Sequence, residues 1–251
     1  GGAFVVLDTL SPRVVAQAIA HHGITWMMAV PSFYEMLLDL GAGGTGPFDL
    51  SSLKVLEAGG AHVGAASLAR MEERFGACFM PVWGCTEASG VALANGPGLD
   101  RRPGATGRPV PGYEIQIVDD HGRALGRGEV GEMVLRGPAV ADGYVNNPDE
   151  TAALFKDGWY YTRDLFRQDE DGWFHFIGRR SEMLKIGGIR VYPLEIEKVL
   201  KDHPEVRDVV VVRAEERVRG EVARAVVAMA PGSQVDVRAL QAYCRDRLAV
   251  Y

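Results

Sequence analysis

Apolar and polar positions alternate in a strand–helix rhythm along the first 95 residues. Between the apolar runs, apolar residues spaced three and four apart predict helices over residues 32–40 and 65–75, and one that begins at Ser11-Pro12. Strand–helix–strand units of this kind predict a mostly parallel α/β sheet. The short apolar runs that predict its buried strands are residues 4–7, 25–30, 54–57 and 78–82.

The pattern changes after two Gly-Pro-rich breaks near residues 96–98 and 102–104. From about 107 to 177, short strands are separated by turn sequences, which predicts a small antiparallel barrel or sheet. A third unit of helices and strands follows Gly178. Its predicted elements are a helix over 193–201, strands over 206–212 and 223–229, and a helix over 235–248.

Composition narrows the functional class. The chain has 251 residues, of which 47% are hydrophobic and 24% charged, as expected of a globular protein with one or two cores. Its net charge of −6 argues against a nucleic-acid partner. The three cysteines, Cys78, Cys85 and Cys244, have no CxxC spacing and suggest reduced thiols in the cytoplasm. No apolar run is long enough to predict a membrane span.

The segment Trp83-Gly84-Cys85-Thr86-Glu87 directly follows an apolar strand. Ligands of open α/β sheets bind beyond the carboxyl ends of strands. A flat aromatic ring there can stack on a base, a threonine hydroxyl can bind a phosphate, and a glutamate can hold Mg²⁺. The alternative is a purely structural turn, with a capping threonine and a first-turn glutamate. A nucleophilic role for Cys85 lacks a partner histidine placed by the sequence.

A second group of polar residues lies in the segments 161–165, 178–180 and 183–188. The carboxylate of Asp164 can accept hydrogen bonds from both hydroxyls of a ribose, and such charge-assisted bonds are strong. The structural alternatives are a β-turn carboxylate for Asp164 and a solvated charge on a strand for Lys185.

Together these segments resemble the adenylate-forming superfamily of acyl-CoA synthetases, luciferases and peptide-synthetase adenylation domains. Trp83-Gly84-Cys85-Thr86-Glu87 is similar to the family's Tyr-Gly-x-Thr-Glu, with Trp83 in place of tyrosine. Thr162-Arg163-Asp164 is similar to Thr-Gly-Asp, with Arg163 in place of glycine. The stretch from Gly131-Glu132 to Gly143-Tyr144 also matches, and we interpret it as scaffold.

The resemblance implies a role for each candidate residue. In the nucleotide site, Thr86 would contact the α-phosphate, Glu87 the metal, Asp164 the ribose, and Arg179 the ribose or phosphate. Ser181 would be the pivot of a hinge, where the family commonly has Asp or Lys. Lys185 would face the active site during thioester formation. The remaining implied site residues are Gly59, Gly60, Ala61, Trp83 and Gly84 around the nucleotide, Gly187 and Gly188 on the CoA side, and Tyr34, Gly59 and Val91 around an apolar acid.

The resemblance also implies the domain plan. Residues 1–98 would form part of a large α/β sheet, 99–177 a β-barrel-like subdomain, 178–182 the hinge, and 183–251 a partial α+β C-terminal lid. The family's phosphate loop and its C-terminal Gly-Lys pair have no counterpart here. We therefore expect the central portion of a chain of about 500 residues, which by itself would catalyse neither half-reaction.

The implied reaction joins a small carboxylic acid to ATP, which releases pyrophosphate, and then to CoA, which releases AMP. Its cofactors would be ATP, Mg²⁺ and CoA. Two alternatives stay open. The acyl group could be loaded onto a carrier protein, or the chain could be a non-catalytic nucleotide-binding module, as Arg163 and the missing lysine would favour.

Overall fold

The computed structural model describes residues 2–40, 48–59, 65–98, 101–216 and 220–249. The chain divides into two compact units, and each consists of three stretches of sequence. The first unit contains Gly1–Ile115, Leu135–Tyr160 and Asp169–His175, and the second contains Gln116–Val134, Tyr161–Gln168 and Phe176–Tyr251.

The first sheet has five strands in the order β1-β2-β3-β4-β5. Strands β1, β2 and β3 run parallel, and the pairs β3–β4 and β4–β5 are antiparallel. The α/β class predicted from the hydrophobic pattern is therefore confirmed. The strands are β1 (Trp26–Ala29), β2 (Val55–Ala58), β3 (Cys78–Cys85), β4 (Gly90–Ala94) and β5 (Arg108–Pro109).

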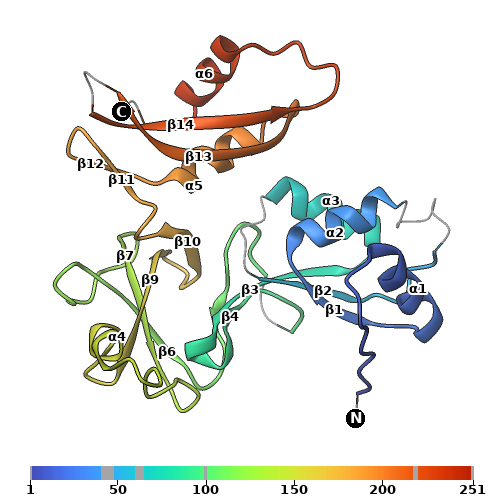
Figure 1. Cartoon of the computed structure of the whole chain (residues 1–251), viewed down its shortest axis with the longest axis horizontal. Helices are drawn as coiled ribbons and strands as arrows, with labels where there is room; N and C mark the ends of the chain where they lie inside the picture. Colours follow the sequence, from blue (N-terminus) through green and yellow to red (C-terminus); the bar gives the residue numbers. More distant parts are fainter. Residues whose placement is uncertain (1, 41–47, 60–64, 99–100, 217–219, 250–251) are drawn as a thin grey trace. The chain divides into compact units, whose positions relative to one another are not determined.

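Three helices pack on this sheet, with α2 and α3 side by side (Figure 1). Helix α1 (Pro12–His22) begins at the predicted Pro12 and ends at Gly23, whose φ of 60° suits a glycine cap. Helix α2 is Pro31–Asp39 and α3 is Ala65–Phe75. All three helices share one core with β2 and β3, which includes Ile19, Tyr34, Leu37, Leu56, Met71 and Phe79.

The prediction of a strand at residues 4–7 is wrong. These residues form no strand, and Phe4 and Val6 are 98% and 90% exposed. An apolar run becomes a strand only where a neighbouring strand and a packed face receive it, and the described residues offer none. The prediction that residues 25–30 are buried is also only partly right. Among the described residues β1 pairs only with β2, and Trp26 and Met28 are exposed.

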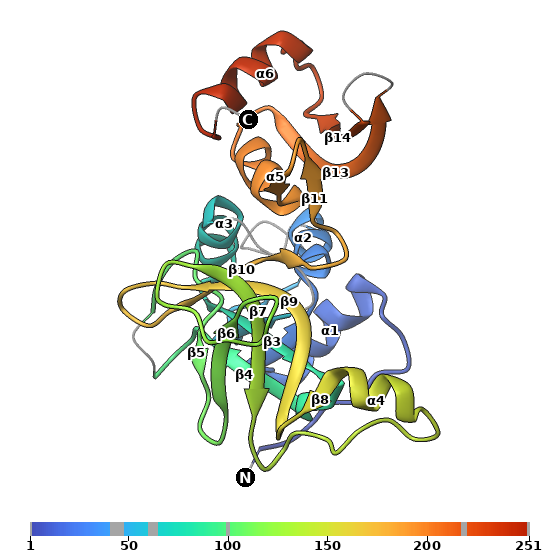
Figure 2. The ribbon, with the colours of Figure 1, turned by 90° about the vertical axis from the view of Figure 1, so that its left-hand side faces the viewer.

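The second sheet has the order β10-β9-β7-β6, and β8 pairs with β9 (Figure 2). The predicted turns lie between its strands. For example, the Asp169 carboxylate accepts the backbone N–H groups of Asp171 and Trp173 in the turn between β9 and β10. The elements are β6 (Glu114–Val118), β7 (Val130–Arg136), α4 (Pro148–Leu154), β8 (Phe155–Lys156), β9 (Trp159–Gln168) and β10 (Phe174–Arg179).

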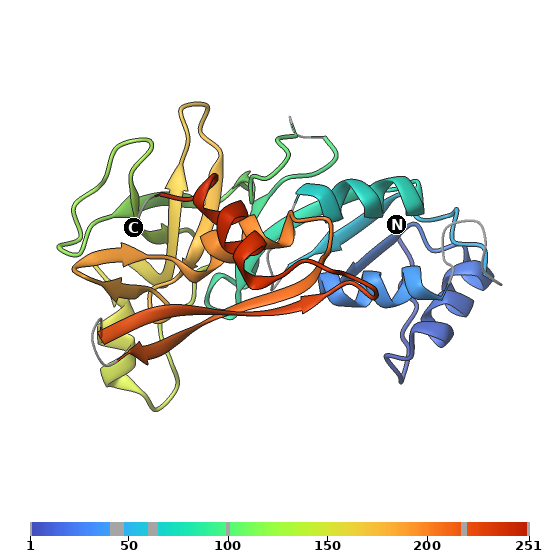
Figure 3. The same ribbon diagram turned by 90° about the horizontal axis from the view of Figure 1, so that it is seen from above.

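The C-terminal part contains two antiparallel hairpins, of which the β13–β14 hairpin is long (Figure 3). Helices α5 and α6 pack with this hairpin around Leu200, Val206 and Leu240. The predicted α+β arrangement is thus present. Its elements are β11 (Leu184–Ile186), β12 (Ile189–Val191), α5 (Pro193–Lys201), β13 (Val206–Glu216), β14 (Gly220–Met229) and α6 (Val237–Arg245).

Candidate functional site

Thr86 and Glu87 lie in a short 3₁₀ turn, Thr86–Ala88, at the carboxyl end of β3. Contacts from other parts of the first unit fix this turn. The backbone N–H of Ala141 donates to the Glu87 carbonyl at 2.8 Å, and the Tyr113 hydroxyl donates to the Ala88 carbonyl. The turn therefore holds the exposed Thr86 beside a partly buried carboxylate.

The Glu87 carboxylate accepts a hydrogen bond from the hydroxyl of Tyr144. Burial by itself raises the pKa of Glu87, but hydrogen bonds, with that from Tyr144 the strongest, outweigh burial and hold this pKa below its usual range. Burial and the Glu87 carboxylate together raise the pKa of Tyr144 to about 12. At neutral pH, Glu87 is thus an anion and Tyr144 a hydrogen-bond donor.

Packing against the neighbouring strand explains why the motif has a glycine at position 84. A Cβ at Gly84 would lie 2.0 Å from the carbonyl oxygen of Gly90 on the neighbouring strand β4. No side chain fits there, so Gly84 permits strand pairing at the irregularity between Trp83 and Gly84. From the sequence, Gly84 was predicted only as a residue around the nucleotide.

Other predicted residues of the first unit lie nearby. Gly59 follows β2, and a Cβ there would lie 3.2 Å from Val82 of β3. Gly59, Trp83, Thr86 and Glu87 thus lie at the carboxyl ends of two neighbouring parallel strands. Gly60 and Ala61 lie outside the described residues.

Asp164 lies in the second unit, on β9, and is only 6% exposed. Its backbone N–H donates to the Thr162 hydroxyl at 3.1 Å, and this hydroxyl donates to the Met133 carbonyl at 2.7 Å. The Arg179 side chain, which is 65% exposed, lies 3.5 Å from the Asp164 carboxylate. The structure therefore brings together two residues that we predicted to contact one nucleotide.

The buried carboxylate of Glu132 on β7 organises this region. It accepts the backbone N–H of Arg163 at 2.9 Å and the guanidinium of Arg180 at 2.8 Å. Our interpretation of the Gly131-Glu132 segment as scaffold agrees with these contacts. Glu132 fixes the chain on both sides of the Asp164–Arg179 pair.

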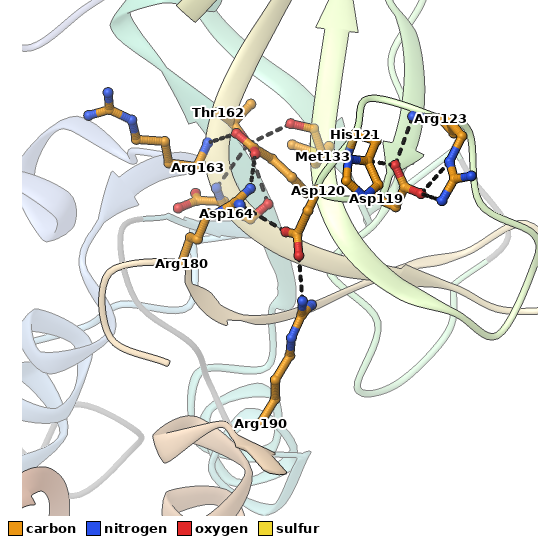
Figure 4. Close-up of polar contacts among 11 residues, drawn as sticks. Asp119, Asp120, His121, Arg123, Met133, Thr162, Arg163, Asp164, Arg180 and Arg190 are labelled. Atoms are coloured by element: carbon orange, nitrogen blue, oxygen red, sulfur yellow. Dashed lines mark hydrogen bonds and ion pairs between the residues drawn. The ribbon is translucent and has the colours of Figure 1, made fainter. Parts of the chain in front are cut away.

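Arg163 has a φ of 60°, in the left-handed region that glycine adopts without strain. The backbone therefore keeps a conformation suited to the glycine of the resembling family, and Figure 4 shows the Arg163 side chain directed away from Asp119 and Asp120. The turn that presents Asp164 is therefore kept although arginine stands where the family has glycine.

We expect the Arg163→Gly variant to be more stable than the Arg163→Ala variant by about 1 kcal/mol. Both substitutions remove the side chain, but only glycine removes the strain of a positive φ. The difference between their urea-unfolding free energies isolates the backbone term. An alanine variant as stable as the glycine variant would contradict this explanation.

Lys185 lies on β11 and is exposed, and Ser181 lies in the turn that follows β10. Both line a cavity of 340 Å³ within the second unit, together with Asp120, Arg180 and Arg190. Gly187 and Gly188 form the two-residue turn between β11 and β12, and both have positive φ. Such a hairpin turn favours glycine whatever else the residues do.

Sequence reasoning missed the role of Tyr144. The pair Gly143-Tyr144 was visible as a motif, but its contact with Glu87 spans 57 positions along the chain. Tyr34 was assigned wrongly to an acid pocket. Its side chain is fully buried, and its hydroxyl oxygen lies 2.8 Å from the carbonyl oxygens of both Met27 and Glu57. The single hydroxyl proton is shared between these two acceptors and ties α2 to β1 and β2.

The three cysteines are free thiols. Burial raises the pKa of the Cys85 thiol to about 11, so this side chain is protonated at neutral pH and is a poor nucleophile. In the described part of the chain, no helix has the length and apolar character needed to cross a membrane.

Comparison with known families agrees with this arrangement. The profile described as AMP-binding enzyme matches residues 1–145, which is more than half of the chain, and the profile described as AMP-binding enzyme C-terminal domain matches residues 195–251. The chain belongs to the AMP-binding enzymes. The resemblance found in its motifs is thereby confirmed.

Individual relatives of this AMP-binding enzyme are CoA ligases and related enzymes. The medium/long-chain-fatty-acid–CoA ligase FadD8 of Mycobacterium tuberculosis is 38% identical over 96% of the chain and 42% of its own length. The amide bond synthetase McbA of Marinactinospora thermotolerans is similar in structure, with a TM-score of 0.88 and 35% identity over 96% of this chain and 50% of its own.

A third relative has been solved with nucleotide and metal. The O-succinylbenzoate CoA synthetase of Bacillus subtilis, in complex with ATP and magnesium ion, has a TM-score of 0.81 and 30% identity. That match covers 96% of this chain and 49% of the synthetase. The chain spans about half the length of the curated relatives that it matches.

Proposed function

We propose that the protein containing this chain is an ATP-dependent carboxylate–CoA ligase. In the first half-reaction, a carboxylate oxygen of the acid attacks the α-phosphorus of ATP, which releases pyrophosphate and forms an acyl-adenylate. In the second, the CoA thiol attacks the acyl carbon and AMP leaves. The names of the relatives include fatty acids and O-succinylbenzoate, so the proposal extends to a carboxylic acid as a class.

The turn Thr86–Ala88 carries this proposal. It presents an exposed hydroxyl and an ionised carboxylate side by side at the carboxyl end of a strand. A hydroxyl donor suits an α-phosphate oxygen, and a carboxylate suits the metal that accompanies ATP. We assign both roles here, with the Trp83 ring and the Gly59 backbone beside the base.

The residues around Glu87 fit a magnesium ion that arrives with the nucleotide. Among the residues that the structure describes, no group of three or more His, Cys, Asp or Glu side chains is placed to hold a metal. Mg²⁺ commonly binds one or two carboxylates and completes its shell with substrate phosphates and water. Glu87 suits that arrangement, in which the ion neutralises developing phosphate charge.

In the second unit, we assign the ribose hydroxyls to Asp164 and a ribose or phosphate contact to Arg179. We further propose that 178–182 is a hinge with Ser181 as pivot, and that 183–251 forms part of a lid. Lys185 and the Gly187-Gly188 turn would then serve the thioester step. The free thiols, which suit a reducing compartment, support a cytoplasmic location.

Pyrophosphate release by the full-length protein tests the proposal. With ATP, Mg²⁺ and a suitable acid, we expect a burst of pyrophosphate without CoA and continued turnover when CoA is added. Turnover that needs a phosphopantetheinyl carrier protein would instead identify a carrier-loading enzyme. A protein that binds ATP but releases no pyrophosphate with any of a panel of fatty and aromatic acids would contradict an enzymatic role.

A further inference from the structure

The carboxylate of Asp120 lies in the turn after β6 and contacts two arginines from later parts of the second unit (Figure 4). Its Oδ1 lies 2.8 Å from the guanidinium of Arg180, and its Oδ2 lies 2.5 Å from that of Arg190. Arg180 directly precedes the proposed pivot Ser181, and Arg190 lies on β12 beyond it. One side chain therefore bridges the two sides of the proposed hinge.

The two arginines differ in how they are held. Arg180 has a second partner, because its guanidinium also binds the buried carboxylate of Glu132 at 2.8 Å. No second carboxylate binds Arg190 among the described residues. Arg180 is thus anchored to β7 without Asp120. Asp120 is the only carboxylate paired with Arg190 in the described part of the chain, and the other group that interacts with Arg190, Tyr192, lies on the same side of the proposed hinge. The Arg190–Asp120 pair is the part of this bridge that can open.

A second contact joins the same segments but has a different character. The Nζ of Lys198 on α5 donates to the carbonyl of Phe176 on β10 at 3.1 Å. This ammonium group is mostly shielded from solvent, which lowers its pKa. Asp120 and Arg190 are 45% and 49% exposed at their side chains, so salt screens their attraction much more than the Lys198 bond.

We propose that Asp120 is a positioning residue, which through Arg190 holds the segment 183–251 in the orientation seen here relative to β6, β7 and β10. This orientation does not depend on what the protein catalyses. Its consequence for catalysis, a bias between the adenylation and thioester steps, rests on the proposed function. The turn at Ser181 is closed by the backbone N–H groups of Glu182 and Met183, which donate to the Arg179 carbonyl at 3.0 and 3.2 Å. In the described part of the chain, no hydrogen bond or ion pair of the Ser181 side chain adds to these two bonds.

The test measures orientation without catalysis. Arg127, before the proposed hinge, and Arg207, beyond it, are both exposed. Each is replaced in the full-length protein by a spin-labelled unnatural amino acid, and the distance between the two labels is measured by pulsed electron paramagnetic resonance. Arg190→Gln and Asp120→Asn open the bridge from either side. Arg123→Gln is the matched control, because Arg123 pairs at 2.7 Å with Asp119 in the same turn but does not cross the hinge.

We expect Arg190→Gln and Asp120→Asn to raise the ratio of alternative to observed distances by about twofold to fivefold. The wild type in 1 M NaCl should change in the same direction, and Arg123→Gln should match the wild type. Distributions for Arg190→Gln that superimpose on the wild type would overturn the proposal, as would an equal change in Arg123→Gln. Because no substrate is present, neither result depends on whether the protein is a CoA ligase.

Discussion

Replacement of Asp164 by alanine should lower kcat/KM for ATP by about 30-fold to 10³-fold, or roughly 2–4 kcal/mol. The Asp164 carboxylate is nearly buried, and its position is fixed by the hydrogen bonds of Thr162 and the neighbouring backbone. A carboxylate held in this way can accept both ribose hydroxyls with little loss of side-chain entropy. Alanine removes both bonds.

The cost of leaving Arg179 without its partner is small, because this arginine is mostly exposed and its contact with Asp164 is long. The loss should therefore appear in ATP use and much less in stability. Asp164→Asn keeps the shape of the side chain and guards against a folding defect. Asp208→Ala, which removes an exposed carboxylate paired with Lys201, is the control. Unchanged kcat/KM for ATP in Asp164→Ala would remove this residue from the nucleotide site.

Helices were predicted best where the sequence itself contains their limits. The predicted ranges 65–75 and 193–201 agree with α3 and α5. For α5, a proline at the first position and basic residues in the last turn mark both ends. The strand predicted at residues 4–7 had no comparable local signal. A strand forms only beside a partner strand, and a short apolar run does not show which partner that would be.

The candidate site shows the same division. Thr86 and Glu87 were predicted because their motif follows an apolar strand, and Asp164 was predicted from its motif alone. The residues that orient them were not, because their contacts join distant positions, such as Glu132 with the backbone of Arg163. The reasons for Gly84 and for the positive φ at Arg163 likewise become visible only when the neighbouring strand and the backbone angles are known.

Substitution of Glu87 by glutamine tests the metal assignment. The carboxylate is ionised at neutral pH because its pKa is held below the usual range. Glutamine has a similar size but no charge, and it therefore binds Mg²⁺ much less well. We expect the Mg²⁺ concentration for half-maximal adenylation to rise on the order of 100-fold in Glu87→Gln, and about 10-fold in Tyr144→Phe, which removes only a hydrogen bond to the ligand.

Glu114→Gln provides the matched control, since Glu114 is an exposed carboxylate of the first unit that pairs with Arg136. Its Mg²⁺ titration should overlay that of the wild type. The order Glu87→Gln, then Tyr144→Phe, then Glu114→Gln separates a direct ligand from a residue that orients it and from a general change in charge. If the titration of Glu87→Gln overlays the wild type while pyrophosphate release persists, the metal is held elsewhere and the Thr86–Ala88 turn serves only to shape the end of β3.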